Sequence, residues 1–259
     1  MKSCLFALLC LIPLPAFTED WQPPEDPDPQ AILNSIRNDV QAKEYETALA
    51  KHVWFYENAL KYQPGLSGVR LSFALSYWKN LSEVYPPALK KLKETRDEAS
   101  RHVLDGKNIW QSFQDLAALN RTLDEDTRTK DTFLLLHQQQ PPMAKKVFLL
   151  AEPALLKARE YQVCGQYLEP EKSYRMMIQS RQVNQRLAKN PRIGPRILEF
   201  SDKKFTNDTT ILVALLVVND RAEEARTIAD QARQEWKNAE FHKALDSALT
   251  GEVPTSWPY

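Results

Sequence analysis

The side chains that could bind a metal are few and widely spaced. The four histidines, His52, His102, His137 and His242, fall in separate segments without an HExxH pattern or another short ligand spacing. A metal site normally needs such a spacing, or a comparable set of Cys and acidic ligands. We therefore predict no metal site and no cofactor. His52 lies within an apolar stripe, which favours a buried core histidine over a ligand.

Catalysis by acidic residues would need two carboxylates at a defined separation, or a nucleophile beside a base. The acidic groups EDPD (25–28) and DEDT (124–127) lie in a proline-rich segment and at the start of a helix. Solubility and the dipole of a helix N-terminus account for both groups. We therefore predict a non-enzymatic protein, with a divergent hydrolase whose site lies in a helical groove as the alternative.

Residues 1–18 have the pattern of a secretory signal peptide. Lys2 precedes an apolar run over residues 4–12, and two prolines and Ala16 follow that run. The run ends well before the roughly 20 apolar residues that a membrane span needs. We expect cleavage near Ala16 or Thr18, and a periplasmic or secreted protein without a membrane span. If the leader stays attached, an envelope structural protein becomes the alternative.

Cys164 is the only cysteine beyond the leader, because Cys4 and Cys10 belong to residues 1–18. No disulfide is therefore predicted within the exported chain. We interpret Cys164 as a small buried hydrophobe, with Gly165 capping its helix, rather than as a reactive or intermolecular thiol.

The balance of charge argues against some partners. The chain has 34 basic and 34 acidic side chains, and loss of the leader removes only Lys2, which leaves a net charge of −1. Non-specific binding to nucleic acid or to anionic lipid depends on a surplus of Lys and Arg. We therefore expect a protein or peptide partner, and no nucleic acid.

Composition favours an all-α fold. The chain has only six glycines, and residues that favour helices fill its long segments. We predict a proline-rich linker or strap over 19–29, helical hairpins over 30–106, a continuing helical array over 107–251 and an extended tail over 252–259.

Amphipathic patterns and Pro or Gly breaks give the expected helices. The helix over 66–85 has apolar residues around half of its circumference, which predicts burial on two sides inside a stacked array. The run 211–218, ILVALLVV, would also suit a buried strand, but we favour a helix. The other expected helices cover 46–62, 86–104, 108–119, the FLLLHQQQ segment, 142–163 with a kink at Pro153, 171–189, and several within 203–249.

The segment KEYETALAKHVWFYENALKYQPG, from Lys43, resembles the end of a tetratricopeptide repeat. The positions of the repeat's Tyr, Ala, aromatic, Ala and Pro are occupied by Tyr45, Ala48, Tyr56, Ala59 and Pro64, with Leu60 next to the second Ala. Four extra residues between the two alanines lengthen the helix by one turn, and the first helix lacks the expected Trp and Gly. The segment RAEEARTIADQA, from Arg221, is similar to the second helix of such a repeat.

This resemblance implies an α-solenoid, a right-handed stack of helical hairpins. It also implies a binding scaffold whose concave face receives a peptide or a partner helix. The layout as a whole, leader included, also resembles exported bacterial proteins of unassigned role.

Trp54 and Arg96 are candidate partner-binding residues. Trp54 lies opposite the apolar stripe of its helix, so either a neighbouring helix or the strap covers it, or it is an exposed anchor for a ligand. Arg96 lies at the centre of an apolar stripe, where an unpaired charge is costly. It either extends its charged end to the surface or pairs with an acid such as Glu83 or Asp115, or it contacts an acidic ligand.

Trp257 and Tyr259 lie in the tail, which Pro254 and Pro258 keep from continuing the last helix. We predict that both rings dock on the C-terminal helices as a cap. The alternative is a displayed tail that inserts into a groove of another protein.

Overall fold

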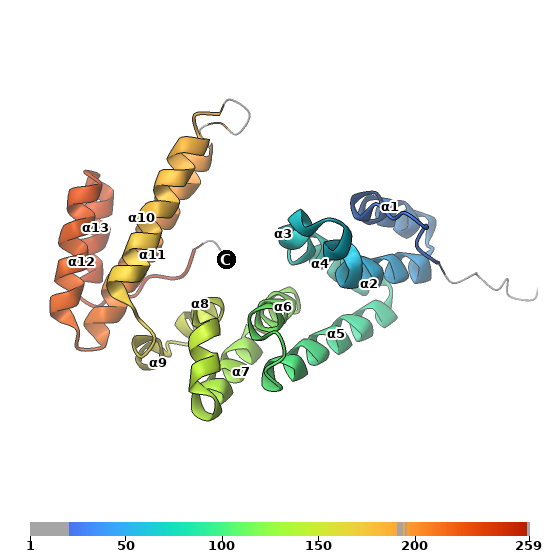
Figure 1. Cartoon of the computed structure of the whole chain (residues 1–259), viewed down its shortest axis with the longest axis horizontal. Helices are drawn as coiled ribbons and strands as arrows, with labels where there is room; N and C mark the ends of the chain where they lie inside the picture. The colour runs from blue at the N-terminus through green and yellow to red at the C-terminus, as the bar shows by residue number, and fades with distance from the viewer. Residues whose placement is uncertain (1–20, 191–193, 195, 258–259) are drawn as a thin grey trace, which may run out of the picture. The chain divides into compact units, whose positions relative to one another are not determined.

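The structure is a computed structural model that describes residues 21–190, 194 and 196–257. Its described residues form thirteen α-helices, one short 3-10 helix and no strand (Figure 1), which confirms the all-α fold class. The run 211–218 lies inside α11 (Arg196–Val218), so the helix prediction for it is also confirmed. The predicted signal peptide lies outside the described residues. Among these residues, no helix combines the length and the apolar character that crossing a membrane requires.

The chain divides into two compact units between Lys91 and Leu92. The first unit contains α1 (Pro29–Ala42), α2 (Tyr45–Tyr62), η1 (Pro64–Leu66), α3 (Ser67–Arg70), α4 (Phe73–Val84) and the start of α5 (Pro86–Leu104). The second contains the rest of α5, then α6 (Ile109–Thr122), α7 (Asp126–Gln139), α8 (Pro141–Lys157), α9 (Tyr161–Gly165), α10 (Pro170–Leu187), α11, α12 (Ala222–Glu235) and α13 (Ala239–Ala248).

The helix predicted over 66–85 is broken at Leu71, so this prediction is wrong in part. Arg70, at the end of α3, is 4% exposed. Its guanidinium lies 4.5 Å from the centre of the Tyr56 ring and donates a hydrogen bond of 3.3 Å to the Tyr56 carbonyl. Gly68 weakens a helix at this point. The chain therefore turns here and brings Arg70 against α2.

The expected burial of α4 on two sides is also wrong. Trp78 on its inner face is buried and stacks on His52 of α2 with ring centroids 5.8 Å apart. On another face Phe73 and Tyr77 are 63% and 50% exposed. A residue pattern shows that a helix face is apolar, but not whether a second helix exists to cover it.

Five helices end in the same left-handed turn. In each turn one residue has φ between 59° and 70°. The N–H of this residue donates to the carbonyl three residues before it, and the N–H of the following residue donates to the carbonyl five residues before that one. The two bonds satisfy carbonyls at the helix end that have no partner within the helix. The left-handed residues are Lys43, Gly106, Asp124, Arg159 and Asp220. One of these turns ends α8 at Lys157, so the predicted continuation of that helix to residue 163 is wrong.

In four of these turns the residue five positions after the left-handed residue is small and buried. These residues are Ala48, Thr129, Cys164 and Ala225. In the α6–α7 hairpin, Asn120 of α6 donates a 3.0 Å hydrogen bond to the Thr129 hydroxyl, so this position faces the preceding helix. A small side chain there allows the two helices to approach closely.

Prolines begin the helices at most of the other connections. Pro29, Pro64, Pro86, Pro141 and Pro170 are the first residues of α1, η1, α5, α8 and α10. The first residue of a helix needs no N–H partner, and the φ angle of proline suits it. Proline also restricts the residue before it to extended backbone. The connections with a left-handed turn and those with a proline at the helix start therefore both depend on a few neighbouring residues.

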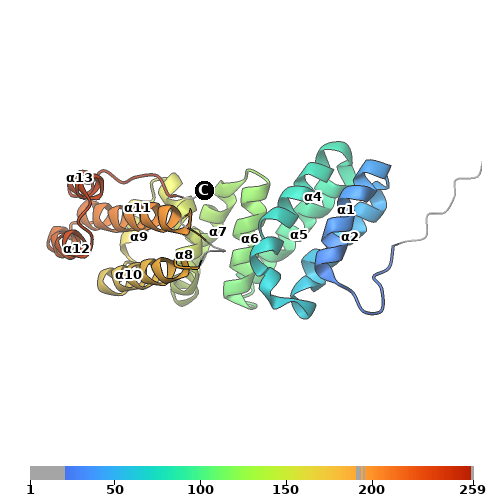
Figure 2. The ribbon, with the colours of Figure 1, turned by 90° about the horizontal axis from the view of Figure 1, so that it is seen from above.

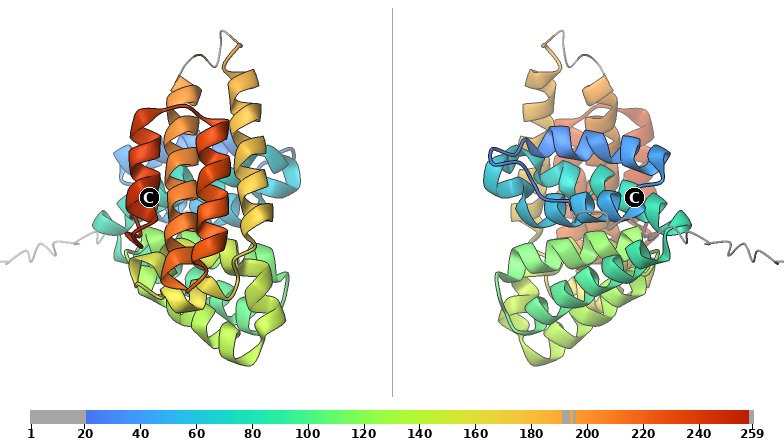
Figure 3. Two further views of the ribbon diagram at one scale, coloured as in Figure 1. Left: turned by 90° about the vertical axis from the view of Figure 1, so that its left-hand side faces the viewer. Right: turned by 90° about the vertical axis from the view of Figure 1, so that its right-hand side faces the viewer.

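Helices α10 to α13 lie side by side in the second unit (Figures 2 and 3). The Phe205 ring of α11 lies 5.4 Å from Phe241 of α13 and 6.2 Å from Trp236, centroid to centroid. Arg181 of α10 pairs with Asp202 at 3.0 Å, and its guanidinium lies 4.3 Å from the centre of the Trp236 ring. Aromatic contacts and one covered cation thus hold this core together.

Gly165 is a point of close approach between α9 and α11. The Asn219 amide donates to the carbonyls of Tyr161 at 3.0 Å and Leu215 at 2.7 Å. A Cβ on Gly165 would lie 2.0 Å from Asn219 Oδ1. Gly165 is the last residue of α9 and its φ is not positive, so the predicted left-handed glycine cap is wrong. The glycine provides space for Asn219 instead.

Replacing Gly165 with Ala should lower the free energy of unfolding by about 1–3 kcal/mol, because Asn219 would have to leave a position that supplies two hydrogen bonds. Urea denaturation measures this change. Gly68→Ala is the matched control, since a Cβ there meets nothing within 4 Å and the residue lies in α3. It should be neutral or stabilising by up to about 1 kcal/mol. Equal losses in both variants would contradict the proposed role of Gly165.

Candidate functional site

An open groove of about 470 Å³ runs along one face of α2 in the first unit. Leu49, Ala50, Val53 and Trp54 line its floor, and residues 21–23 of the proline-rich segment form one side. The buried residues of α2 lie on a different face: Ala48, His52, Phe55 and Ala59. Helix α2 thus uses one face for the core and leaves a second, partly apolar face open. We call this feature the α2 groove.

Trp54 joins the proline-rich segment to α2. The Trp21 ring meets Trp54 edge to face with centroids 6.2 Å apart, and Tyr62 stacks on Trp54 at 5.8 Å. Lys51 Nζ lies 5.9 Å from the centre of the Trp21 ring. The strap therefore covers Trp54 in part, as one of the two interpretations expects. Trp54 also lines the groove, so its role in binding a partner stays a prediction.

The ends of the α2 groove are polar. Glu46 and Tyr85 belong to one end, and Glu57 and Asn58 lie three turns further along α2. Burial, followed by the charge and hydrogen bond of Glu46, raises the pKa of Tyr85. The Tyr85 hydroxyl therefore stays protonated at neutral pH and acts as a donor. The two acids and Lys91 give the lining a net charge of −1.

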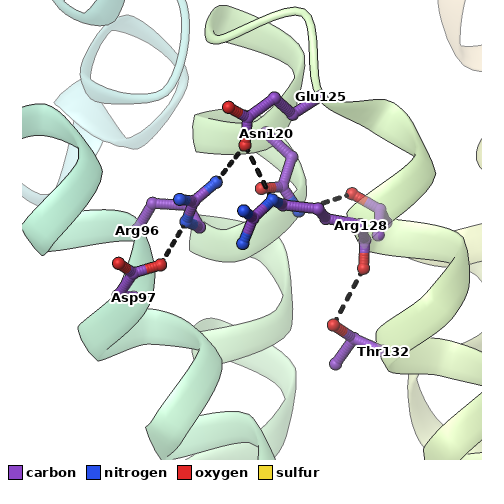
Figure 4. Close-up of polar contacts among 7 residues, drawn as sticks. Arg96, Asp97, Asn120, Glu125, Arg128 and Thr132 are labelled. Atoms are coloured by element: carbon purple, nitrogen blue, oxygen red, sulfur yellow. Dashed lines mark hydrogen bonds and ion pairs between the residues drawn. The ribbon is translucent and has the colours of Figure 1, made fainter. Parts of the chain in front are cut away.

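Arg96 is buried, with 3% of its surface exposed, and forms ion pairs within the second unit (Figure 4). Its Nε donates to Asp97 Oδ1 at 2.6 Å, and its Nη1 donates to Glu125 Oε2. Arg128 also pairs with this Glu125 oxygen, at 2.9 Å. The arrangement matches the structural interpretation of Arg96 and gives no direct support to its contact with an acidic ligand.

The partners of Arg96 differ from the acids named from the sequence, Glu83 and Asp115. Glu125 follows the left-handed residue Asp124 and is the N-cap residue of α7. The turn that ends α6 therefore brings Glu125 to Arg96. Helical periodicity within α5 carried no information about this turn.

The tail docks on α11. The Asn207 amide donates to the Thr255 carbonyl, and its oxygen accepts from the Trp257 N–H, both at 2.8 Å. The Trp257 ring lies 5.2 Å from the Phe200 ring. Trp257 therefore contacts the C-terminal helices, as the docking interpretation expects. Tyr259 lies outside the described residues.

Glu152 is an acid whose pKa lies near neutrality, and sequence reasoning missed it. Burial and then the charge of Asp208 raise its pKa to about 7, against the opposing effect of Lys204. Burial and then Glu152 raise the pKa of Cys164 to about 12, which keeps this thiol protonated and unreactive. The available signal was a lone acid within the apolar run 148–156. Glu152 is absent from the lining of the α2 groove.

His52 is 2% exposed and stacks on Trp78. Burial lowers its pKa to about 3, so the ring is neutral at neutral pH. Its Nε2 is buried without a hydrogen-bond partner among the described residues. The predicted core position is therefore confirmed, although one ring nitrogen is unsatisfied.

In the part of the chain that the structure describes, no three His, Cys, Asp or Glu residues are grouped so that they could hold a metal ion. Comparisons with known proteins found no matching family model, no similar curated protein and no similar solved structure.

The burial of His52 predicts a loss of stability in acid. Between pH 6.5 and about 3 the unfolded chain binds a proton at this residue that the folded chain excludes. The free energy of unfolding should therefore fall with decreasing pH, by up to about 1.4 kcal/mol per pH unit. His52→Leu should remove this component in urea denaturation across the range. His102→Gln, at an exposed histidine, should keep the wild-type slope. An unchanged slope in His52→Leu would disprove the assignment.

Proposed function

We propose that this protein is a non-enzymatic interaction module that binds a peptide or a segment of a protein partner in the α2 groove. The observation that carries the proposal is the open groove itself, in which Trp21 and Trp54 lie beside aliphatic side chains and the ends are polar. Tryptophan is enriched among the residues that contribute most to protein–protein binding. The Gln22 amide adds a hydrogen-bonding group for a peptide backbone.

The length of the groove suits a short peptide. Its lining residues on α2 run from Glu46 to Asn58, which is about 18 Å at 1.5 Å per residue. An extended segment of about five residues covers that distance. The acidic net charge of the lining favours a segment that carries Lys or Arg.

The positions of the groove acids favour binding over hydrolysis. Glu46 and Glu57 are eleven residues apart on one helix, which separates them by about 16 Å along its axis. Paired catalytic carboxylates lie about 5–10 Å apart. Glu152 and Asp208, an acid of raised pKa and a charge that contributes to that shift, do not line the groove.

A tetratricopeptide-like stack of hairpins is the proposed framework. Its support is the left-handed turn followed, five residues later, by a small buried side chain. Lys43 and Ala48 form one such pair within the segment that resembles the repeat. Asp220, directly before the second segment, and Ala225 within it form another. A crystal structure in which successive hairpins stack with a left-handed sense would contradict this proposal.

Partner capture tests the groove. Tagged protein incubated with an extract of the native cell envelope or culture medium should recover a partner that mass spectrometry identifies. Trp54→Ala should reduce this recovery at least about tenfold, since removal of a central aromatic anchor costs 2 kcal/mol or more. Trp110→Ala is the matched control, because Trp110 is 48% exposed on α6 and lies outside the groove.

Trp54 also holds the strap, so a second variant separates binding from folding. Glu57→Lys reverses an exposed charge in the groove lining and should weaken partner recovery without changing the melting temperature. Equal recovery by wild type, Trp54→Ala and Glu57→Lys would overturn the proposed site. Turnover of a small substrate that Glu152→Gln abolishes would favour the hydrolase instead.

The proposed place of action is the periplasm or the space outside the cell. Its support is the leader pattern of residues 1–18. Intact-mass measurement and N-terminal sequencing of exported protein should show a chain that begins shortly after Ala16 or Thr18. A chain that begins at Met1 would favour a tethered envelope protein, and protein found only in the cytoplasm would contradict export.

A further inference from the structure

A second hollow, of about 500 Å³, lies within the second unit and shares no residue with the α2 groove. Its walls come from α6, the start of α7, the second half of α8, the turn after α8, the first residue of α9 and residues 253–256 of the tail. We call it the tail pocket. Its size falls in the range of pockets that hold small organic ligands, about 300–1,000 Å³.

Basic side chains outnumber acidic ones in the lining of the tail pocket. Arg121, Lys157 and Arg159 line it, and Asp126 is the one acid in the lining. Lys157 Nζ lies 2.7 Å from Asp126 Oδ2, so the charges of these two residues offset each other. Arg159, which is exposed, then presents a positive charge to the pocket.

Arg159 is fixed by the left-handed turn that ends α8. Its N–H bonds to the Leu156 carbonyl at 3.0 Å, and the Glu160 N–H bonds to the Leu155 carbonyl at 2.9 Å. Its φ of 60° is an uncommon state for a residue with a side chain. The Arg159 side chain is exposed. A rigid backbone thus presents an exposed guanidinium at the pocket.

The rest of the lining combines apolar and hydroxyl groups. Leu150, Ala154 and Pro254 are among its apolar residues. Tyr161 and Ser256 add hydroxyls that can donate hydrogen bonds. A ligand that fits this lining has a charged end and an apolar body.

We infer that the tail pocket binds an oxyanion, a carboxylate or a phosphate, carried on a short aliphatic chain. The guanidinium fork of arginine donates two parallel hydrogen bonds to either anion. The apolar lining would shield the aliphatic chain from water. A neutral head group could not form an ion pair with the Arg159 guanidinium, and a cationic one would be repelled by it. This inference does not depend on the proposed function of the α2 groove.

The tail is part of the site. Residues 253–256 line the pocket, and the two hydrogen bonds of Asn207 to Thr255 and Trp257 hold this segment on α11. Release of the tail would remove one wall while the helices stay in place. The pocket therefore predicts that ligand affinity depends on Asn207, a residue that does not line it.

Isothermal titration calorimetry on the full exported chain tests the inference with defined probes. Octanoate and octyl phosphate should bind at least about tenfold more tightly than 1-octanol and octylamine, since a charge-assisted pair contributes about a factor of ten or more. The ratio between octanoate and octyl phosphate identifies the preferred oxyanion. Acetate and inorganic phosphate, which lack the chain, should bind more weakly than either.

Variants at Arg159 test the role of the guanidinium. Arg159→Asn removes the charge but tolerates the left-handed backbone, and should weaken octanoate or octyl phosphate binding about tenfold. Arg159→Asp should weaken it further. Lys43→Asn is the matched control, because Lys43 is a cation in the same kind of turn and lies outside the pocket. It should leave affinity unchanged, and Asn207→Ala should reduce it with little change in helix content.

Equal affinity for octanoate and octanol, or equal weakening by Arg159→Asn and Lys43→Asn, would overturn the inference. Absence of binding of both anionic probes at millimolar concentration would also overturn it. None of these results bears on partner capture by the α2 groove, so the two proposals fail separately.

Discussion

The structure depends on how the chain closes a helical hairpin. A left-handed residue ends one helix with two hydrogen bonds, and the next helix begins within a few residues. The small buried residue five positions after it then lets the two helices approach. A larger side chain there would force the helices apart or leave the left-handed turn strained. With only six glycines in the chain, four of the five turns use a residue that carries a side chain.

The position of α2 between the core and the strap follows from its two faces. Ala48 and Ala59 are fully buried, so the backbone of α2 lies close to its neighbours on that side. The other face carries Trp54, which is partly buried and is not among the buried residues of α2. Trp21 covers it in part, at the end of a segment whose prolines limit its conformations. The groove is the part of this face that Trp21 leaves open.

Much of the fold follows from the sequence because helix limits depend on local signals. Proline fixed the start of α5 at Pro86 and its end is at Leu104, as the pattern predicts. The break at Leu71 was missed: beside it, Arg70 contacts Tyr56 on another helix. Periodicity describes the faces of one helix and contains no information about a partner on another.

In the candidate sites, too, local features could be predicted from the sequence and contacts between distant residues could not. The sequence marked Trp54 because a large aromatic on a polar face is a local anomaly. It also gave reasons to expect docking of Trp257, since a large ring in a proline-bearing tail gains by burial. It did not reveal Glu152 as a titrating group, because the pKa depends on Asp208 and on burial that only the fold creates. It did not reveal the tail pocket either, because the lining joins residues more than a hundred positions apart.

The left-handed turns are local signals that also contribute side chains to the candidate sites. Their backbone requirement is shared, but their side chains differ: Lys43, Asp124, Arg159 and Asp220 occupy the same backbone state. Glycine would satisfy that state with less strain. The turn requires a backbone conformation and no particular side chain, so the residue type at this position can suit the groups around it. At Arg159 those surroundings are the tail pocket, in which Lys157 pairs with Asp126, so the turn adds a cation to a lining that also has apolar and hydroxyl groups. A cation fixed in the lining of a partly apolar hollow favours an anion within it.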